Sequence, residues 1–397
     1  MSGAGCGAYV RLACYRDLVE TRDNNIQGDV MKRRDFVRSA GAGALGAAAA
    51  ASSSFPAPAL AQGVKQLKMV TTWPKNYPGL GTGAERMAQR IGEMSEGRIE
   101  VKVYAAGELV PAFQSFDAVS SGNAEMSHSA SYYWQGKSPG FNFFTAVPFG
   151  LLPMEHASWI AYGGGQELWD ELAAQFSIKP FLRASTGPQM GGWFRREVNT
   201  LDDYKGLKFR MPGLGGEVLR RLGASVVALP GGEIFPALQS GAIDGTEWVG
   251  PWHDLAFGFY KVAQLYYHPG WHEPGTTGEV MINLGVWESL TPQEQAMMRV
   301  AIEAEAWREY AEINAQNAGA LKVLVDQHNV QVRRFSDELL QEIGRISGEV
   351  VAEVGASDPL TQRIYDSYME FRINAIEWGE IADQGYYNAR SLPFQYG

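Results

Sequence analysis

The sequence alternates between strand-like and helix-like segments, and this alternation constrains the fold more than any other feature. Residues 66–72 and 99–104 are typical of strands, and apolar residues at helical spacing predict a helix over 84–94 between them. A shorter helix over 113–121 follows. Strands that alternate with helices form a mostly parallel sheet with crossover helices. We therefore expect an α/β fold.

The same alternation returns in the middle of the chain. Strands are predicted over 207–211, 225–229 and 243–248, with helices over 215–222 and 233–240. No long linker rich in proline or serine separates this unit from the first. Two α/β domains joined by crossing strands would produce this pattern.

The last hundred residues have a different pattern. Apolar residues step by three and four from Met297 to Val325, which predicts one long helix, and a second stripe runs from Leu360 to Trp378. These helices either cover the two domains or pack against a second copy of the chain.

We therefore expect three regions after residue 61. Residues 62–180 form a first domain that is completed by later crossing segments, and residues 181–290 form a second domain. Residues 291–397 provide helices that bridge the domains and form a dimer interface.

The N-terminal region has the composition of an export signal. Residues 32–38 are basic, residues 40–51 are mildly apolar, and residues 56–61 end in a small-x-small pattern. This order is typical of a secretory signal, so we assign it to residues 31–61 and expect a periplasmic protein. The alternative is a chance basic pair before an alanine-rich linker.

The basic segment also suggests the export route and the start of the working protein. Arg33 and Arg34, followed by Phe36, resemble a twin-arginine (Tat) signal. Because Met31 stands directly before this segment, we expect residues 1–30 to be an upstream extension that is not part of the working protein.

Composition and charge exclude several classes of protein. The formal charge of −10 argues against a nucleic-acid binder. The long uncharged run from Ser39 to Leu60 is mostly alanine, glycine and serine, so it does not predict a membrane span. Both cysteines, Cys6 and Cys14, precede the expected cleavage site, which excludes disulfides and cysteine-ligated metals from the mature chain.

One motif points to an enzyme. Residues 79–84 fit the G-x-G-x-x-A dinucleotide pattern, which would make the chain a Tat-exported nicotinamide oxidoreductase. Against this, residues 73–78 separate the predicted strand from the first glycine, and no acidic residue ends the second strand. His268 and His272 do not lie on a shared helical face, so we do not expect them to form a metal site.

Three segments carry candidate binding residues. Residues 187–194 form a glycine-rich turn, residues 209–213 carry Arg210 at a strand end, and residues 237–248 place Glu247 at the end of another strand. Ligands of open α/β sheets bind at the carboxyl ends of strands, where Arg210 and Glu247 both fall.

These segments resemble a known family. The Lys-Phe-Arg-Met-Pro run at 208–212 and the run at 237–245, with the two long terminal helices, resemble the extracytoplasmic solute-binding subunit of tripartite ATP-independent periplasmic (TRAP) transporters. The resemblance covers residues 64–397. Residues 132–134, 143–150 and 189–193 are similar to the subgroup that binds 2-oxo monocarboxylates such as pyruvate and 2-oxobutyrate.

The resemblance implies a fold and a set of partners. The fold would be a two-domain periplasmic binding protein with mixed sheets, crossing strands and long C-terminal helices. The protein would close on a small ligand without catalysis and deliver it to the small and large membrane subunits of the transporter. It would be a homodimer and would not bind nucleic acid.

The resemblance also assigns roles to residues. Arg210 would pair with the carboxylate of the solute, for which a planar guanidinium is well suited. Gln189, Glu247, the carbonyl of Trp248 and Glu273 would ligate a cation, which the 2-oxo acid would chelate through one carboxylate oxygen and its keto oxygen. Tyr133 and the region of Phe194 would line the pocket, with the tyrosine as a hydroxyl donor.

The identity of the cation stays open. Two glutamates, one arginine and a monocarboxylate leave two negative charges, so a calcium ion would neutralise the site and a sodium ion would not. The resemblance favours Na⁺, which we place first, with Ca²⁺ as the alternative. A receptor for lactate or another 2-hydroxy acid, using the same cleft, is the alternative within the class.

Overall fold

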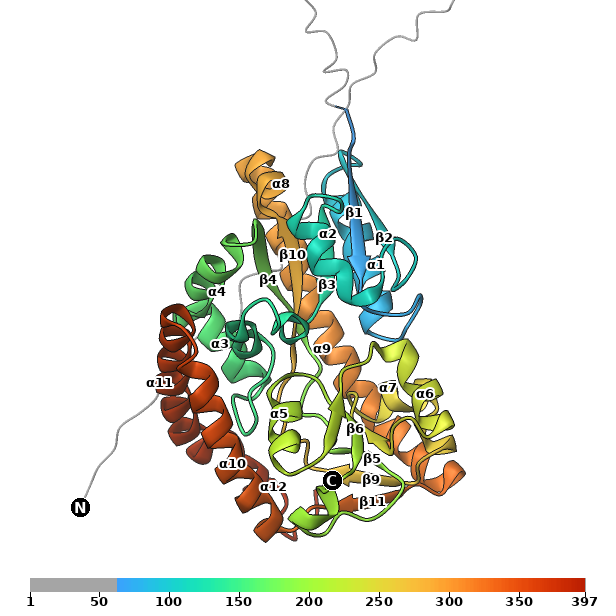
Figure 1. The fold of residues 1–397 in the computed structure, drawn as a ribbon. Helices are drawn as coiled ribbons and strands as arrows, with labels where there is room; N and C mark the ends of the chain where they lie inside the picture. The colour runs from blue at the N-terminus through green and yellow to red at the C-terminus, as the bar shows by residue number, and fades with distance from the viewer. Residues whose placement is uncertain (1–62, 397) are drawn as a thin grey trace, which may run out of the picture. The chain divides into compact units, whose positions relative to one another are not determined.

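The computed structural model describes residues 63–396. The predicted signal at 31–61 and the predicted extension at 1–30 lie outside the described residues. A five-stranded sheet has the order β2-β1-β3-β10-β4 (Figure 1). Its strands are β1 (Lys65–Thr71), β2 (Ile99–Tyr104), β3 (Met126–Ser129), β4 (Ile178–Ser185) and β10 (Thr277–Asn283).

A second sheet has six strands in the order β11-β9-β5-β8-β6-β7. Its strands are β5 (Gly192–Phe194), β6 (Lys208–Arg210), β7 (Ser225–Val227), β8 (Gly245–Thr246), β9 (Leu265–His268) and β11 (Gln331–Arg334). The chain passes from the first sheet to the second after β4 and returns in β10, so the predicted crossing strands are present.

Both sheets are mixed. The strands predicted from the alternating pattern are parallel, since β1 pairs with β2 and β3, and β6 pairs with β7 and β8. The crossing segments add antiparallel strands, because β10 pairs antiparallel with β3 and β4, and β5 pairs antiparallel with β8 and β9. The expectation of a mostly parallel sheet therefore holds within each alternating unit but not for the crossing segments.

Short helices connect and cover the strands. The α-helices before residue 290 are α1 (Leu80–Met94), α2 (Ser115–Ser120), α3 (Pro153–Tyr162), α4 (Gly165–Ala174), α5 (Gly213–Arg221), α6 (Gly231–Ser240), α7 (Pro251–Phe257) and α8 (Leu284–Ser289). The 3₁₀ helices are η1 (Ala112–Gln114), η2 (Ser131–Trp134), η3 (Pro139–Phe144), η4 (Leu201–Tyr204) and η5 (Phe259–Lys261).

Helix α9 (Pro292–His328) spans 37 residues and links elements of the two sheets. It begins with a capping box in which Thr291 and Glu294 bond each other's backbone, and it ends at Asn329 in the left-handed conformation. It packs against β4 and α1, which belong with the first sheet, and against α7, which follows a strand of the second sheet (Figure 1).

The predicted apolar stripe of this helix does not face the interior. Val300 and Trp307 are 50% and 66% exposed, whereas Met298, Ile302 and Ile313 are buried. The prediction of a long helix is confirmed, but the expectation that this stripe covers the domains is wrong. The buried face runs through Met298, Ala301, Ile302, Glu305, Glu309, Ile313, Ala320 and Leu324.

The chain ends in three helices, α10 (Asp337–Gly355), α11 (Pro359–Ile381) and α12 (Asp383–Arg390). The second predicted stripe starts as a buried face, because Ile364 and Tyr368 of α11 are buried. It ends in solvent at Trp378, which is 68% exposed.

One apolar cluster joins elements of the two sheets. Trp73, Tyr77 and Leu80, which follow β1, pack in one core with Trp248 and Val249, which follow β8. This packing brings the strand ends of the two sheets together and places the candidate site between them.

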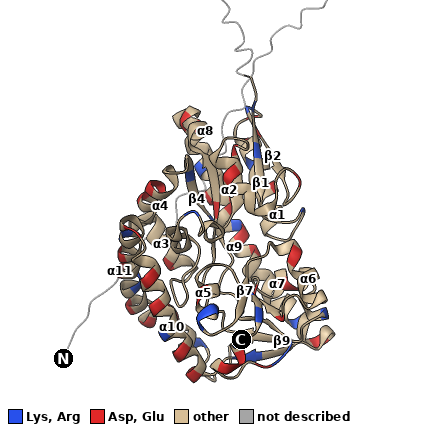
Figure 2. Cartoon of the chain, viewed as in Figure 1, with Lys and Arg blue, Asp and Glu red and all other residues tan. Residues whose placement is uncertain are grey.

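Basic and acidic residues are interspersed along the described part of the chain (Figure 2). Within residues 63–396, every helix is too short or too polar to cross a membrane.

Candidate ligand and cation site

Arg210 and Glu247 meet because their strands are parallel neighbours. Arg210 ends β6 and pairs in register with Thr246 of β8, so Glu247 follows at the same edge of the sheet. The Glu247 N–H donates to the Arg210 carbonyl over 3.3 Å. Both side chains are fully buried. The predicted meeting of these two residues at strand ends is what the fold produces.

The Arg210 guanidinium is held on one side only. Its Nη1 donates to Glu247 Oε1, and its Nε donates to the Leu229 carbonyl over 3.1 Å. Its Nη2 has no hydrogen-bond partner among the described residues. Burial opposes the charge of Arg210, but Glu247 acts together with the two neighbouring tyrosines and Glu273, and their combined effect raises the pKa of the guanidinium. A charged donor edge therefore remains available for a carboxylate.

Gln189 presents its carbonyl oxygen to the site. The Gln189 amide nitrogen donates to Thr186 Oγ1 over 3.1 Å and to Thr276 Oγ1 over 2.8 Å. These bonds fix the amide, and its Oε1 has no partner within the described part of the chain. Thr276 also donates to Glu273 Oε2, so this one threonine orients two candidate ligands. The sequence did not indicate Thr276.

The acidic side chains form a compact group with an imidazole. Ligand atoms of Glu247, His272 and Glu273 lie within 4.8 Å of one another. His272 Nε2 is 3.5 Å from Glu247 Oε2. That oxygen and Glu273 Oε1 are buried and, across residues 63–396, find no hydrogen-bond partner.

Burial shifts the protonation of this group. It raises the pKa of Glu247 to about 7, against the opposing charge of Arg210. It raises the pKa of Glu273 to about 8, with a further rise from the neighbouring Glu247. It lowers the pKa of His272 to about 4, so the imidazole is neutral near pH 7.

The donor set fits a hard cation. Partnerless oxygens stand on Gln189, Glu247 and Glu273. The two carboxyl groups lie together, and Thr276 links the Gln189 amide to Glu273. Carboxylate and amide oxygens are the ligands that sodium and calcium prefer. The fourth predicted ligand, the carbonyl of Trp248, belongs to the residue after Glu247, and its role stays a prediction.

The loop that carries Glu247 and Trp248 is anchored by Asp254 of α7. The Asp254 carboxylate accepts hydrogen bonds from Trp193 Nε1 over 2.9 Å, Tyr266 Oη over 2.7 Å and the Val249 N–H over 3.2 Å. The indole of Trp248 donates to Tyr77 Oη over 3.1 Å. Burial raises the pKa of Asp254 to about 7.

A small cavity of about 20 Å³ opens beside Gln189. The predicted pocket residue Tyr133 lines it, together with Tyr132, which the sequence reasoning missed. The cavity is lined by Trp73, Leu80, Ala130, Tyr132, Tyr133, Arg183, Thr186, Gln189, Trp248, Val249, Thr276 and Gly278.

Two minor expectations need correction. Phe194 does not line the cavity, because its ring packs in the core against Phe209 and Tyr267. His272, which was not expected in a metal site, lies against the candidate cation ligand Glu247 and groups with it and Glu273. The sequence could not indicate this contact because the two residues are far apart in the chain.

The glycine motif at 79–84 is used for packing. Helix α1 starts at Leu80, before the second glycine of the motif. A Cβ on Gly81 would lie 2.7 Å from the Pro74 carbonyl, and one on Gly83 would lie 2.7 Å from Glu309 Oε2. A carboxylate against this turn would repel a pyrophosphate, so the oxidoreductase alternative is wrong.

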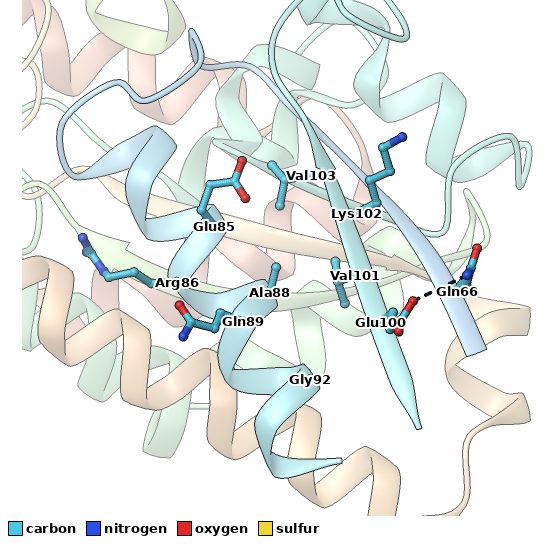
Figure 3. A pocket seen from close by; sticks show the side chains of 10 residues that line it. All are labelled: Gln66, Glu85, Arg86, Ala88, Gln89, Gly92, Glu100, Val101, Lys102 and Val103. Carbon is cyan, nitrogen blue, oxygen red and sulfur yellow. Dashed lines mark hydrogen bonds between the residues drawn. The ribbon is translucent and has the colours of Figure 1, made fainter. Parts of the chain in front are cut away.

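A larger groove of about 680 Å³ lies between α1 and β2 (Figure 3). Glu85 and Arg86 line its helix side, and Glu100 and Lys102 line its strand side. None of the predicted site residues lines this groove. Its side chains carry both charges, so it does not compete with Arg210 as an anion site.

The fold has two mixed β-sheets covered by helices, and a buried arginine lies beside a group of buried carboxylates where the sheets meet. This architecture defines a two-domain solute-binding protein of the periplasmic type. The chain belongs to the bacterial extracellular solute-binding protein family 7 (DctP), whose model matches residues 69–358. It is therefore a solute-binding protein of the TRAP transporter class and not an enzyme.

Known relatives are similar over almost the whole described chain. A monocarboxylate 2-oxoacid-binding periplasmic protein of Nostoc sp. is 39% identical over 363 residues, which cover 91% of this chain and 99% of the relative. A TRAP solute-binding protein of Pseudoalteromonas atlantica, crystallised with bound sodium and pyruvate, is 40% identical with a TM-score of 0.80, covering 83% of this chain and 100% of the other.

A third similar protein is the TRAP solute-binding protein of Bordetella bronchiseptica. It is 34% identical, has a TM-score of 0.81, and the match covers 82% of this chain and 97% of the other. Its crystal structure is described as a mixed-occupancy dimer with copurified calcium and picolinate in one active site.

Proposed function

We propose that this protein is the periplasmic receptor of a TRAP transporter, and that it binds a 2-oxo monocarboxylate such as pyruvate or 2-oxobutyrate together with a cation. It would deliver the solute to the small and large membrane subunits. The observation that carries this proposal is the unpartnered Nη2 of Arg210, whose guanidinium bonds Glu247, together with the partnerless oxygens on Gln189, Glu247 and Glu273.

Each group has a defined task in this proposal. The Arg210 edge takes the solute carboxylate through charge-assisted hydrogen bonds. The cation supplies positive charge against Glu247 and Glu273 and attracts the 2-oxo oxygen of the solute. A fatty acid without that oxygen loses this attraction, which explains a preference for 2-oxo acids.

Sodium and calcium both suit this donor set. The Pseudoalteromonas relative holds sodium with pyruvate, and the Bordetella relative holds calcium with picolinate, an acid whose ring nitrogen stands beside the carboxylate. The charge count favours calcium, and the resemblance found in the sequence favours sodium. We keep Na⁺ as the first assignment and Ca²⁺ as the second.

Binding is tested by titrating tryptophan fluorescence with pyruvate, 2-oxobutyrate, lactate and succinate, with and without a chelator. The proposal expects the 2-oxo acids to bind most tightly and Arg210→Ala to abolish binding, with an affinity loss of at least ~100-fold for a charge-assisted contact. Arg210→Lys keeps a charge beside Glu247 and serves as the folded control. A preference for lactate would favour the 2-hydroxy-acid alternative, and unchanged pyruvate affinity in both variants would mean that the pocket is misplaced.

We also propose that the protein reaches the periplasm through a Tat signal at residues 31–61. The basic pair Arg33-Arg34 and the small-x-small pattern before Gln62 support this route. N-terminal sequencing of the mature protein checks it. A start well before residue 55 would contradict it.

We propose that two copies associate through the C-terminal helices. Large apolar side chains are exposed on neighbouring α11 and α12, with Trp378 at 68%, Ile381 at 78% and Tyr386 at 68% exposure. Exposed apolar patches of this kind mark interaction surfaces. A second copy is the partner that we assign, because the similar Bordetella protein is described as a dimer.

The dimer is tested with Trp378→Glu and Ile381→Glu in light scattering after gel filtration. A charge in an apolar interface costs several kcal/mol, so both variants should elute as monomers. Glu370→Gln on the same helix is the control and should stay dimeric. A monomeric parent protein at high micromolar concentration would overturn this proposal without touching the solute assignment.

A further inference from the structure

The buried group of Glu247, His272 and Glu273 contains one side chain that the proposed sodium or calcium site does not use. His272 is 1% exposed, and neither of its ring nitrogens has a hydrogen-bond partner among residues 63–396. Buried polar groups in proteins almost always have a partner. The imidazole is therefore free to bind a ligand.

The backbone around His272 is fixed. The Gln189 N–H donates to the Glu273 carbonyl over 3.3 Å, and the Glu273 N–H donates to the Gly270 carbonyl over 3.1 Å. On the other side, an added Cβ on Gly215 of α5 would lie 2.7 Å from His272 Cβ, so the two segments pack closely. The imidazole is thus presented to the carboxylates from a close-packed segment of the chain.

The spacing of the three side chains suits one small dication. His272 Nε2 is 3.5 Å from Glu247 Oε2, and ligand atoms of all three residues lie within 4.8 Å of one another. With zinc bond lengths of about 2.0 to 2.2 Å, two ligand atoms on one tetrahedral ion lie roughly 3.4 Å apart. The imidazole and Glu247 already have this spacing, and a small side-chain rotation brings Glu273 to it.

An imidazole changes which cations such a group prefers. Calcium takes oxygen ligands, whereas imidazole nitrogen suits zinc, copper, nickel and iron. For a site of nitrogen and oxygen ligands, affinity rises along the first-row dications toward copper and zinc. The two carboxylates, when ionised, carry more negative charge than Arg210 balances, which also favours a dication over a monovalent ion.

We infer that Glu247, His272 and Glu273 form a mixed nitrogen and oxygen site for a divalent transition metal, which zinc represents. This metal competes with sodium or calcium, because the same two carboxylates serve both. The inference rests on the proposed function only in sharing Glu247 and Glu273 with its cation site. The receptor therefore holds one class of cation at a time, and His272 gives it affinity for the transition metals.

The test is calorimetric titration of metal-free, untagged protein with Zn²⁺ and with Ca²⁺. The parent protein should bind zinc more tightly than calcium, and excess calcium should lower the apparent zinc affinity. His272→Gln removes the nitrogen ligand, so zinc affinity should fall at least ~100-fold, because even an outer-shell partner of a metal ligand is worth about 10- to 100-fold. Calcium affinity should change far less.

A spectrum and a matched control separate ligation from stability. Co²⁺ bound to the parent protein should give visible absorption bands that shift in His272→Gln, since these bands depend on the ligands of the ion. His253 of α7 is equally buried but lies outside the group of carboxylates. His253→Gln should keep the zinc affinity and the cobalt spectrum of the parent protein. If His272→Gln fails to fold, competition between zinc and calcium in the parent protein still decides.

The outcomes distinguish this inference from the proposed function. Equal zinc affinity in the parent and in His272→Gln, or zinc binding that calcium does not oppose, would overturn the inference alone if pyruvate still binds with sodium or calcium. Zinc binding that depends on His272, in a protein that binds no 2-oxo acid, would support the inference and overturn the proposed function. Absence of zinc binding and of pyruvate binding would overturn both.

Discussion

Replacing Glu279 with glutamine should make the stability of this protein less sensitive to pH. Glu279 lies on β10, is fully buried, and accepts hydrogen bonds from Ser131 and from the indole of Trp134. These two residues flank Tyr132 and Tyr133, which line the small cavity beside Gln189. Glu279 therefore holds the tyrosine segment in place from the first sheet.

The size of the effect follows from the protonation of this carboxyl. Burial raises the pKa of Glu279 from 4.5 to about 7, against the two hydrogen bonds that favour its charge. A folded-state pKa above the unfolded value gives stability that is fully present below pH ~4.5 and lost as pH rises through ~7. At 1.36 kcal/mol per pH unit, the loss between pH 5 and pH 8 is roughly 2 to 3 kcal/mol.

Urea denaturation at pH 5 and pH 8 measures this loss directly. The free energy of unfolding of the parent protein minus that of Glu279→Gln should fall by roughly 2 to 3 kcal/mol between the two pH values, since glutamine keeps an acceptor oxygen but does not titrate. The difference between the two proteins cancels the pH-dependent stability contributions of titratable groups that both share, such as the buried histidines. Glu85→Gln, on the exposed face of α1, should give a difference that does not change with pH. A difference for Glu279→Gln that is equally flat would refute the reasoning.

Two further substitutions test how the site loop is held. Asp254→Ala should lower the free energy of unfolding by at least ~3 kcal/mol in urea denaturation, because three buried donors lose their acceptor at about 1 to 3 kcal/mol each; a loss below ~1 kcal/mol would contradict this role. Tyr77→Phe should cost roughly 1 to 3 kcal/mol, since its hydroxyl accepts from Trp248 and donates to the His253 carbonyl. Tyr267→Phe removes a single bond and should cost about half as much, so equal losses would mean that one of the Tyr77 bonds is not made.

The sequence predicted those elements whose side chains alternate between a buried and an exposed face. Residues 99–104 were predicted as a strand with the limits that β2 has. Strands β3 and β10 were not predicted as such, because they are buried on both faces and carry no alternation. Periodicity alone does not distinguish a strand that is buried on both faces from a buried segment of helix.

The face of α9 was predicted wrongly for a specific physical reason. Its buried side includes Glu305 and Glu309, which are paired with Arg86 and Arg183. Hydrophobic patterning assigns charged residues to the exposed face of a helix, so it places Glu305 and Glu309 on the solvent side. The pattern therefore predicted that the stripe through Trp307 is buried, whereas Trp307 is exposed. Buried ion pairs hide the interior face of a helix from hydrophobic patterning.

The candidate site was predictable where strand order determines proximity. Arg210 and Glu247 follow parallel neighbours, so their meeting could be inferred from the alternation of strands and helices. Supporting residues could not be found in this way. Thr276 bonds Gln189 across 87 positions, and Glu279 bonds Ser131 across 148 positions, so their pairing depends on the crossing strands.

The charges of the site link the two proposed ligands. Glu247 bonds the Arg210 guanidinium through one oxygen. Glu273 adds a second buried carboxyl, and among the described residues no cationic side chain lies within hydrogen-bond distance of it. A solute carboxylate on Arg210 would add a third negative charge, which a low-dielectric interior disfavours without a cation. A cation would hold Glu247 and Glu273 in their charged forms, against the effect of burial. Each ligand thus removes the cost that opposes the other, and since such coupling is reciprocal, the factor by which the cation tightens the acid must equal the factor by which the acid tightens the cation.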